Sequence, residues 1–179
     1  PVVLAKEAAT LDALSGGRFE LGLGAGWLQT EYEQAGLPFD PPGIRISRMA
    51  EAIQVLKGLF ADGPLTYNGA HYTIAGLDGY PKPAQRPHPP LLIGGAGKRI
   101  LGIAAREADI IHLMPRTIAT GTLVSDPRDR LTASVAEKIG WLREAAGDRF
   151  ADIELGCGAS FVVSNNRRTA TERLIKERQ

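Results

Sequence analysis

Glycine alternates with apolar residues in the segment FELGLGAGW, at positions Gly22, Gly24 and Gly26. The alternation predicts a strand over residues 18–24, with large apolar side chains on one face and almost no side chains on the other. Glycine weakens a strand, so its repetition favours a place where a ligand approaches the main chain closely. The alternative is that the glycines only let neighbouring elements pack, and the residues alone leave both interpretations open.

A second glycine-rich segment, IGGAGKR, follows a short apolar strand predicted at residues 91–93 and opens a helix. Free backbone N–H groups and the helix dipole at such a junction favour an anion such as phosphate, and Lys98 and Arg99 add positive charge. A tight strand-to-helix turn without a ligand is the alternative. The segment is no Walker loop, because neither Ser nor Thr follows Lys98, and Trp27 breaks a dinucleotide fingerprint in the first segment.

The remaining candidates for chemistry are few. His71, His88 and His112 show no metal-ligand spacing, and with a single cysteine no zinc site is expected. His112 lies near the predicted end of a strand, where it either faces a pocket or is a structural histidine with satisfied hydrogen bonds. Trp27 either lines a pocket or packs in the core. Ser15 and Ser160 have no neighbouring base pattern, which gives little support to a nucleophilic hydrolase.

The composition is that of an ordinary globular domain: 179 residues, 44% hydrophobic, 23% charged and a net charge of +1. The mixed charges give no footprint for nucleic acid or acidic membranes. The single cysteine, Cys157, favours a reducing compartment and therefore a cytoplasmic protein. Because Pro1 already stands inside a predicted helix, we expect an internal segment of a longer protein.

Strands and helices alternate along the chain, which predicts a parallel α/β sheet, either doubly wound or closed as a barrel. An eight-stranded barrel takes roughly 250 residues, so the barrel would be incomplete over residues 1–179, a single domain. Residues 61–90 are predicted to be an insertion with a hairpin at Asn68–Gly69. Later strands are predicted at 109–113 and 153–163, and a last helix, capped by Asn165 or Asn166, runs to 179.

Two details of the helices add to this prediction. Gly16 and Gly17 predict a left-handed cap at the end of the first helix. On the helix that carries Ile46 to Phe60, three charged residues recur at three-residue steps, so they are expected to reach one another: Arg45, Arg48 and Glu51.

Several segments together resemble the luciferase-like monooxygenase superfamily, and within it the coenzyme F420-dependent oxidoreductases. They are LAKEAATLDALSGGRFELGLGAGW, RISRMAEAIQVLKGLF, LTYNGAHYTI and PKPAQRPHPPLLIGGAGKRILGIAAREADIIHL. The likeness is nearly continuous from Pro1 to about Leu113 and looser beyond it.

The resemblance implies a (β/α)8 TIM barrel with its cofactor at the C-terminal ends of the strands. It implies that the phosphate is held by Gly94, Gly95, Gly97 and Lys98, and that the ring system lies beside Gly24, Gly26, Trp27 and Thr30. In some sugar-phosphate dehydrogenases of the family a catalytic glutamate stands at the position of Trp27, so their substrate is not carried over. The resemblance also implies that the first three strands and the last one of the barrel lie outside the given chain, and no catalytic residue is assigned.

The predicted function is F420-dependent hydride transfer to or from a small organic substrate. The alternatives are an FMN-dependent monooxygenase of the same fold, a non-catalytic cofactor-binding barrel, and a phosphate-binding hydrolase or aldolase barrel. Specificity is expected in residues 40–43, in the hairpin insertion and in the loop 114–125. Members of the family commonly form dimers, so a homodimer is expected. We expect no metal, no nucleic-acid partner and no membrane partner.

Overall fold

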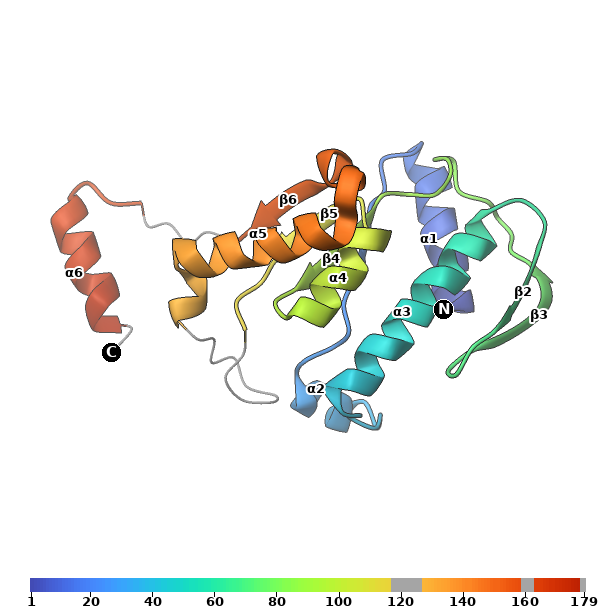
Figure 1. Cartoon of the computed structure of the whole chain (residues 1–179), viewed down its shortest axis with the longest axis horizontal. Helices are drawn as coiled ribbons and strands as arrows, with labels where there is room; N and C mark the ends of the chain where they lie inside the picture. The colour runs from blue at the N-terminus through green and yellow to red at the C-terminus, as the bar shows by residue number, and fades with distance from the viewer. Residues whose placement is uncertain (117–126, 159–162, 178–179) are drawn as a thin grey trace.

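A four-stranded parallel sheet forms the centre of the computed structural model, which describes residues 1–116, 127–158 and 163–177 (Figure 1). The strand order is β1–β4–β5–β6, with β1 at Leu21–Leu23, β4 at Leu91–Gly95, β5 at Ile110–Leu113 and β6 at Glu154–Cys157. Parallel pairing places the carboxyl ends of all four strands at one edge. The two glycine-rich segments, which follow β1 and end β4, therefore lie at the same edge of the sheet.

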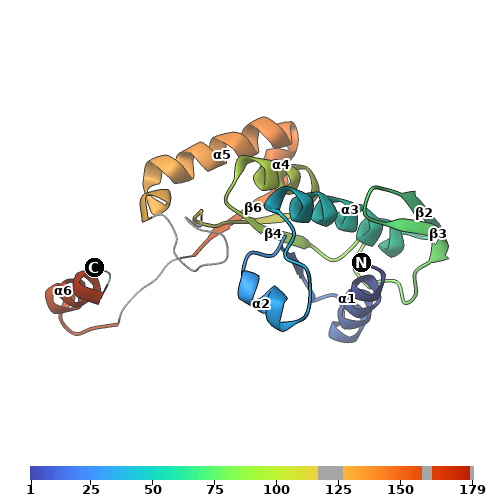
Figure 2. The same cartoon turned by 90° about the horizontal axis from the view of Figure 1, so that it is seen from below.

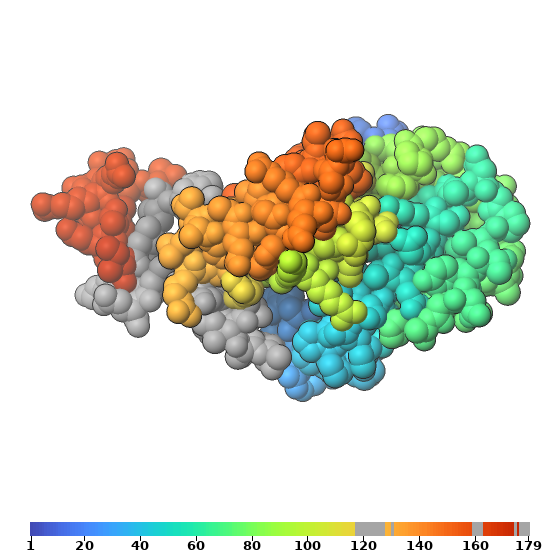
Figure 3. Space-filling view, in the orientation of Figure 1, coloured from blue at the N-terminus to red at the C-terminus, as the bar shows by residue number. Residues whose placement is uncertain are grey.

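Helices alternate with the strands along the chain, and three of them lie over one face of the sheet (Figure 2). The helices are α1 (Val2–Ser15), α2 (Gln29–Gln34), α3 (Pro42–Phe60), α4 (Lys98–Glu107), α5 (Thr132–Ala146) and α6 (Arg167–Glu177), with 3-10 turns at Pro127–Arg130 and Gly147–Asp152. Figure 2 shows α3, α4 and α5 on the same side of the strands. The same three helices form the near surface in Figure 3, with α4 between α3 and α5. No helix in the described ranges is long and apolar enough to cross a membrane.

The two faces of the sheet differ in burial. Leu91, Ile93 and Ile111 are 0% exposed and pack with apolar residues of α4, including Leu101 and Ala104. Residues that alternate with them are half-buried or exposed, because the described helices leave their side of the sheet uncovered. We call this side the open face; it carries Gly22, Leu92, Gly94, Ile110, His112 and Gly156.

The insertion forms an antiparallel hairpin of β2 (Pro64–Asn68) and β3 (Thr73–Asp78), as predicted. Glu51 holds its turn: the carboxylate accepts N–H groups of Ala70, His71 and Tyr72 at 3.0, 2.8 and 3.2 Å. Burial raises the pKa of this carboxyl, but the three N–H donors outweigh it and leave the pKa below its usual value.

The expected contact among the three charged residues of α3 is wrong. Glu51 binds the hairpin, whereas Arg45 donates to carbonyl groups of Ala25 and Asp40, and Arg48 pairs with the Asp40 carboxylate at 2.7 Å. Their spacing allows mutual contact, but Glu51 binds the hairpin turn, and both arginines bind residues that precede α3.

The predicted order of strands and helices is confirmed, with differences in extent. The first strand begins at Leu21 rather than residue 18, and the fourth strand of the sheet ends at Cys157, with residues 159–162 outside the described ranges. Helix α2 was not predicted, because its sequence QTEYEQ has no apolar period. The side chain of Asn166 caps α6 through the N–H groups of Arg168 and Thr169, at 3.1 and 3.2 Å. The left-handed cap of α1 at Gly16, with φ 67°, is also confirmed.

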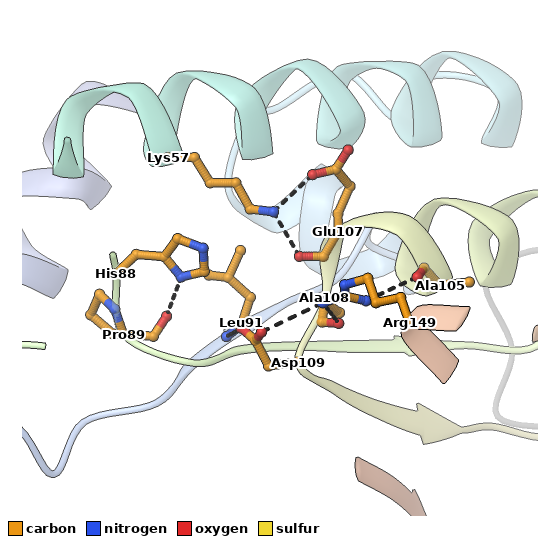
Figure 4. A network of polar contacts seen from close by, with 9 residues as sticks. All are labelled: Lys57, His88, Pro89, Leu91, Ala105, Glu107, Ala108, Asp109 and Arg149. Atoms are coloured by element: carbon orange, nitrogen blue, oxygen red, sulfur yellow. Dashed lines mark hydrogen bonds and ion pairs between the residues drawn. The ribbon is translucent and has the colours of Figure 1, made fainter. Parts of the chain in front are cut away.

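Polar contacts fix the amino ends of β4 and β5 (Figure 4). The Leu91 N–H donates to the Asp109 carboxylate at 2.9 Å, and the Asp109 N–H donates to the Leu91 carbonyl at 2.9 Å. Arg149 donates to the carbonyl groups of Ala105 and Ala108, at 2.9 and 2.5 Å. This edge of the sheet is thus occupied by structural contacts, which leaves the carboxyl edge for a ligand.

Asp12 joins the end of α1 to the segment that precedes β4. It is 0% exposed, and its carboxylate accepts the N–H and side-chain amide of Gln85 at 2.8 and 2.7 Å. The same amide donates to the Phe19 carbonyl at 2.8 Å, just before β1. These contacts hold the entries to β1 and β4 side by side.

Asp12→Ala should lower the free energy of unfolding by about 1–3 kcal/mol, since it removes the buried carboxylate that accepts two hydrogen bonds from half-buried Gln85. Urea unfolding of the full-length protein measures this. Glu7→Ala, at an exposed position of the same helix, is the control and should change stability by less than about 0.5 kcal/mol. Equal stability of the two variants would contradict the assigned role of Asp12.

Candidate functional site

Main chain without side chains lines the carboxyl edge of the open face. Gly22 pairs with Leu92, and Gly24, just past β1, continues the same face toward Gly94. A Cβ placed on Gly22 or Gly24 would meet no described atom within 4 Å, and neither residue has a positive φ. A Cβ on Gly94 would meet only the Met114 Cγ, at 3.8 Å. We call Gly22, Gly24 and Gly94 the glycine strip: neither backbone conformation nor crowding by the described chain requires glycine there.

Two of the other predicted cofactor residues are glycines that the fold itself requires. Gly26 has a φ of 74°, and a Cβ there would overlap the Tyr32 hydroxyl. Gly95 points to the covered face, where a Cβ would lie 2.7 Å from the Ile100 Cγ2 of α4. Packing accounts for both, which separates them from the glycine strip.

The first turn of α4 starts at the same edge. Gly97 is its N-cap residue in an extended conformation, with φ −93° and ψ 154°, and no side chain caps the helix. A Cβ on Gly97 would meet no described atom within 4 Å. Uncapped N–H groups at a helix start favour an anion, and here they lie at the end of the strand that carries Gly94.

The cations beside this helix start are directed to neighbouring helices. The Lys98 ammonium lies 3.4 Å from the Glu144 carboxylate of α5, with both side chains largely exposed. Arg99 donates to the Gly43 carbonyl at 3.0 Å and to the Ser47 hydroxyl at 2.8 Å, both on α3. The backbone N–H groups at the start of α4 have no side-chain cap and can meet an anion at the edge, and the role of Lys98 in binding a phosphate stays a prediction.

Trp27 and Thr30 lie in the segment between β1 and α3. Trp27 is 43% exposed, so the alternative of core packing does not apply, and Thr30 is exposed in the first turn of α2. Arg45, only 8% exposed, anchors this segment: its Nε donates to the Ala25 carbonyl at 3.3 Å, and its guanidinium lies 4.0 Å from the Phe39 ring centroid. The sequence did not reveal this anchor, because Arg45 contacts residues up to 20 positions away.

A buried ion pair holds the segment that follows β5. The Lys138 ammonium, on α5, lies 2.6 Å from the Asp129 carboxylate and 2.8 Å from the Met114 carbonyl, and both charged side chains are buried. Asp129 also accepts the Ser134 hydroxyl and the Arg116 N–H, each at 2.5 Å. Met114, beside the glycine strip, is thereby fixed to α5. The rest of the predicted specificity loop, 117–125, lies outside the described residues, as does Ser160.

Burial raises the pKa of Asp129, but Lys138 and the other donors outweigh it and hold the pKa well below its usual range. The sequence contained a signal for this pair that was missed. Lys138 lies at helical spacing with Val135 and Leu142, on the apolar stripe of α5, where a solvated lysine is not expected.

The histidines lie in three different environments. His71 lies in the hairpin turn, and the Nδ1 of His88 is 2.9 Å from the Pro89 carbonyl oxygen (Figure 4). His112 is half-buried on the open face, opposite Gly94 and Gly156 in the register of the sheet. Within the ranges that the structure describes, no three His, Cys, Asp or Glu side chains are grouped to hold a metal.

Residues 1–179 match the family model described as luciferase-like monooxygenase. The chain belongs to this family. It is 33% identical over 109 residues to the FMNH(2)-dependent dimethylsulfone monooxygenase of Pseudomonas putida. The matched stretch covers 61% of this chain and 30% of that protein. It is 32% identical over 139 residues to the pyrimidine monooxygenase RutA of Stutzerimonas stutzeri, covering 76% of this chain and 38% of that protein.

Among solved structures, the fold resembles the coenzyme F420 dependent tetrahydromethanopterin reductase of Methanopyrus kandleri. The TM-score is 0.72 at 23% identity, over 96% of this chain and 49% of that chain. The prediction of a luciferase-like TIM barrel, present here in part, is confirmed at the level of the fold. The chain spans about a third of the length of the two curated relatives and about half of this structure.

The Asp129–Lys138 pair predicts a specific pH dependence of stability. Because the pKa of Asp129 is lower in the folded protein, the pair should contribute fully at neutral pH and progressively less as the pH falls below the unfolded value of about 3.9. Urea unfolding of the full-length protein and of Asp129→Asn at pH 3 to 7 measures this. The stability difference should be large at pH 7 and shrink toward pH 3. A difference independent of pH would contradict it.

Proposed function

We propose that the protein binds a flavin-type cofactor over the glycine strip and uses reduced FMN to oxygenate a small organic substrate. The observation that carries this proposal is the glycine strip. Gly22 weakens β1, and together with Gly24 it leaves bare main chain that no contact of the described chain requires. A flat ring system that lies directly on the main chain would explain why these positions carry no side chain. The names of the two curated relatives, both monooxygenases and one FMNH(2)-dependent, support the choice of FMN and of oxygenation.

The residues at the carboxyl edge fit such a cofactor. The glycine strip offers a flat floor, and the uncapped start of α4 after Gly97 offers N–H groups to a phosphate. Trp27 and Thr30 would border the ring system, and Met114 would contact it from the side. When bound, reduced flavin supplies the electrons that activate oxygen; this chain's own residues bind, orient and exclude water.

F420-dependent hydride transfer is the second candidate. It is supported by the segments that resemble F420-dependent oxidoreductases and by F420-dependent enzymes among the solved structures of like fold. A deazaflavin has the same flat tricycle and a phosphate, so the strip and the start of α4 fit it equally. The named curated relatives favour FMN. The homodimer and the cytoplasmic location stay predictions.

Titration of the full-length protein with FMN and with F420 separates these candidates. We expect FMN to bind and to raise the thermal midpoint, since a ligand of the native state stabilises it by about 2.7 kcal/mol at a hundredfold excess over its Kd. Mixing the reduced complex with oxygen should then consume oxygen. Binding of F420 alone would overturn the choice of FMN. Binding of neither would overturn a flavin-type site and favour a phosphate-binding hydrolase or aldolase barrel.

A pair of glycine variants tests the glycine strip itself. Gly24→Val places a side chain in open space, so stability should change by less than about 0.5 kcal/mol, while the affinity for the cofactor should fall more than tenfold. Gly95→Ala is the matched control: its Cβ meets Ile100, so it should destabilise by about 1–3 kcal/mol with the affinity retained. Chemical unfolding and fluorescence titration measure both. Unchanged affinity in Gly24→Val would show that no ligand lies on the strip.

A further inference from the structure

His112 is a half-buried histidine whose ring nitrogens have no hydrogen-bond or ion-pair partner in the described structure. His88, by contrast, has its Nδ1 2.9 Å from a carbonyl oxygen. A neutral imidazole carries one N–H donor and one acceptor nitrogen. Within the described residues the imidazole nitrogens are thus uncommitted, and water or a ligand at the carboxyl edge can bind them.

The row of the sheet that contains His112 otherwise lacks side chains. In register, Gly94 of β4 lies beside His112, and Gly156 of β6 lies on its other side. The imidazole leans toward β6: its Nδ1 would be 3.0 Å from a Cβ on Gly156, and its Nε2 would be 3.8 Å from one on Gly158. Glycine at 156 thus makes room for the imidazole, and above Gly94 the nearest described side chain is Met114, whose Cγ would lie 3.8 Å from a Cβ there.

The position of His112 fixes what it can touch. Neighbouring strands lie about 4.8 Å apart, so a flat ring system that rests on Gly94 reaches the side chain of the next strand. Other charged groups near the carboxyl end of β5, Asp129 and Lys138, are engaged with each other. Glu154 of β6 shares the face of His112 but pairs with Ile110, one row nearer the amino ends.

We propose that His112 is a binding residue that contacts the edge of the cofactor's ring system through an imidazole nitrogen. This proposal rests on the proposed flavin-type site and goes beyond it by naming the side chain that binds the edge of the ring system. Flavin-type rings carry carbonyl and ring-nitrogen groups along one edge, which match the donor and acceptor of a neutral imidazole. The same contact serves FMN or a deazaflavin.

Two variants of the full-length protein test the contact. His112→Leu removes both polar atoms, and His112→Gln keeps a donor and an acceptor. Each is titrated with FMN and with F420, and the visible spectrum of whichever cofactor binds is recorded. We expect the leucine variant to bind at least tenfold more weakly with a shifted spectrum, and the glutamine variant to recover most of the affinity. His71→Gln, in the hairpin turn, is the matched control and should leave affinity and spectrum unchanged.

A third variant keeps the imidazole and displaces it. Gly156→Ala puts a Cβ 3.0 Å from the Nδ1, so the ring must move, and the spectrum of the bound cofactor should shift with His112 still present. Thermal midpoints of all variants control for folding. Wild-type binding with an unchanged spectrum and affinity in His112→Leu would overturn the role of His112 alone. Failure of the wild type to bind either cofactor would overturn the flavin-type site, and His112 with it.

Discussion

The parallel pairing of β1 with β4 is the constraint on which the candidate site depends. β1 has only three residues, Leu21–Leu23, yet it brings Gly22 and Gly24 beside β4, about seventy positions later in the chain. The Leu21 N–H donates to the Pro90 carbonyl at 2.9 Å at the entry to this pairing. Asp12 and Gln85 clamp the segments just before both strands. The glycine strip is thus a product of long-range contacts rather than of either segment alone.

The burial of one sheet face decides which glycines a ligand can meet. Helices α3, α4 and α5 cover the face that carries Leu91, Ile93 and Gly95, so Gly95 serves the approach of α4. Gly94, its direct neighbour, lies on the open face, where no helix packs against it. Glycine is therefore present at these two adjacent positions for different physical reasons, because alternation along the strand places them on opposite faces of the sheet.

Local periodicity made most of the fold predictable, because apolar alternation and helical spacing record burial directly. The strands of the sheet, the hairpin at Asn68–Gly69 and the caps of α1 and α6 follow from such local signals. Contacts between distant segments carry no comparable signal. Arg45 on Ala25, the placement of Gly95 against Ile100, and the absence of a partner for His112 all depend on which elements become neighbours. Lys138 is the exception, since its place on the apolar stripe of α5 was visible in the sequence.

The glycine strip and the start of α4 select for two properties, flatness and negative charge. FMN and F420 share both, so neither feature distinguishes them. Discrimination must come from side chains that border the strip and meet the edge of the ring, where the two cofactors differ by one atom and in their substituents. His112, Met114 and Trp27 are the described side chains placed at or beside that edge. Of these, His112 and Trp27 carry polar side-chain atoms, whereas the Met114 side chain offers only a thioether. In the proposed site His112 would bind the ring edge of either cofactor, so discrimination between them is left to the other side chains that border the strip. The Asp129–Lys138 pair holds the Met114 backbone in place beside them.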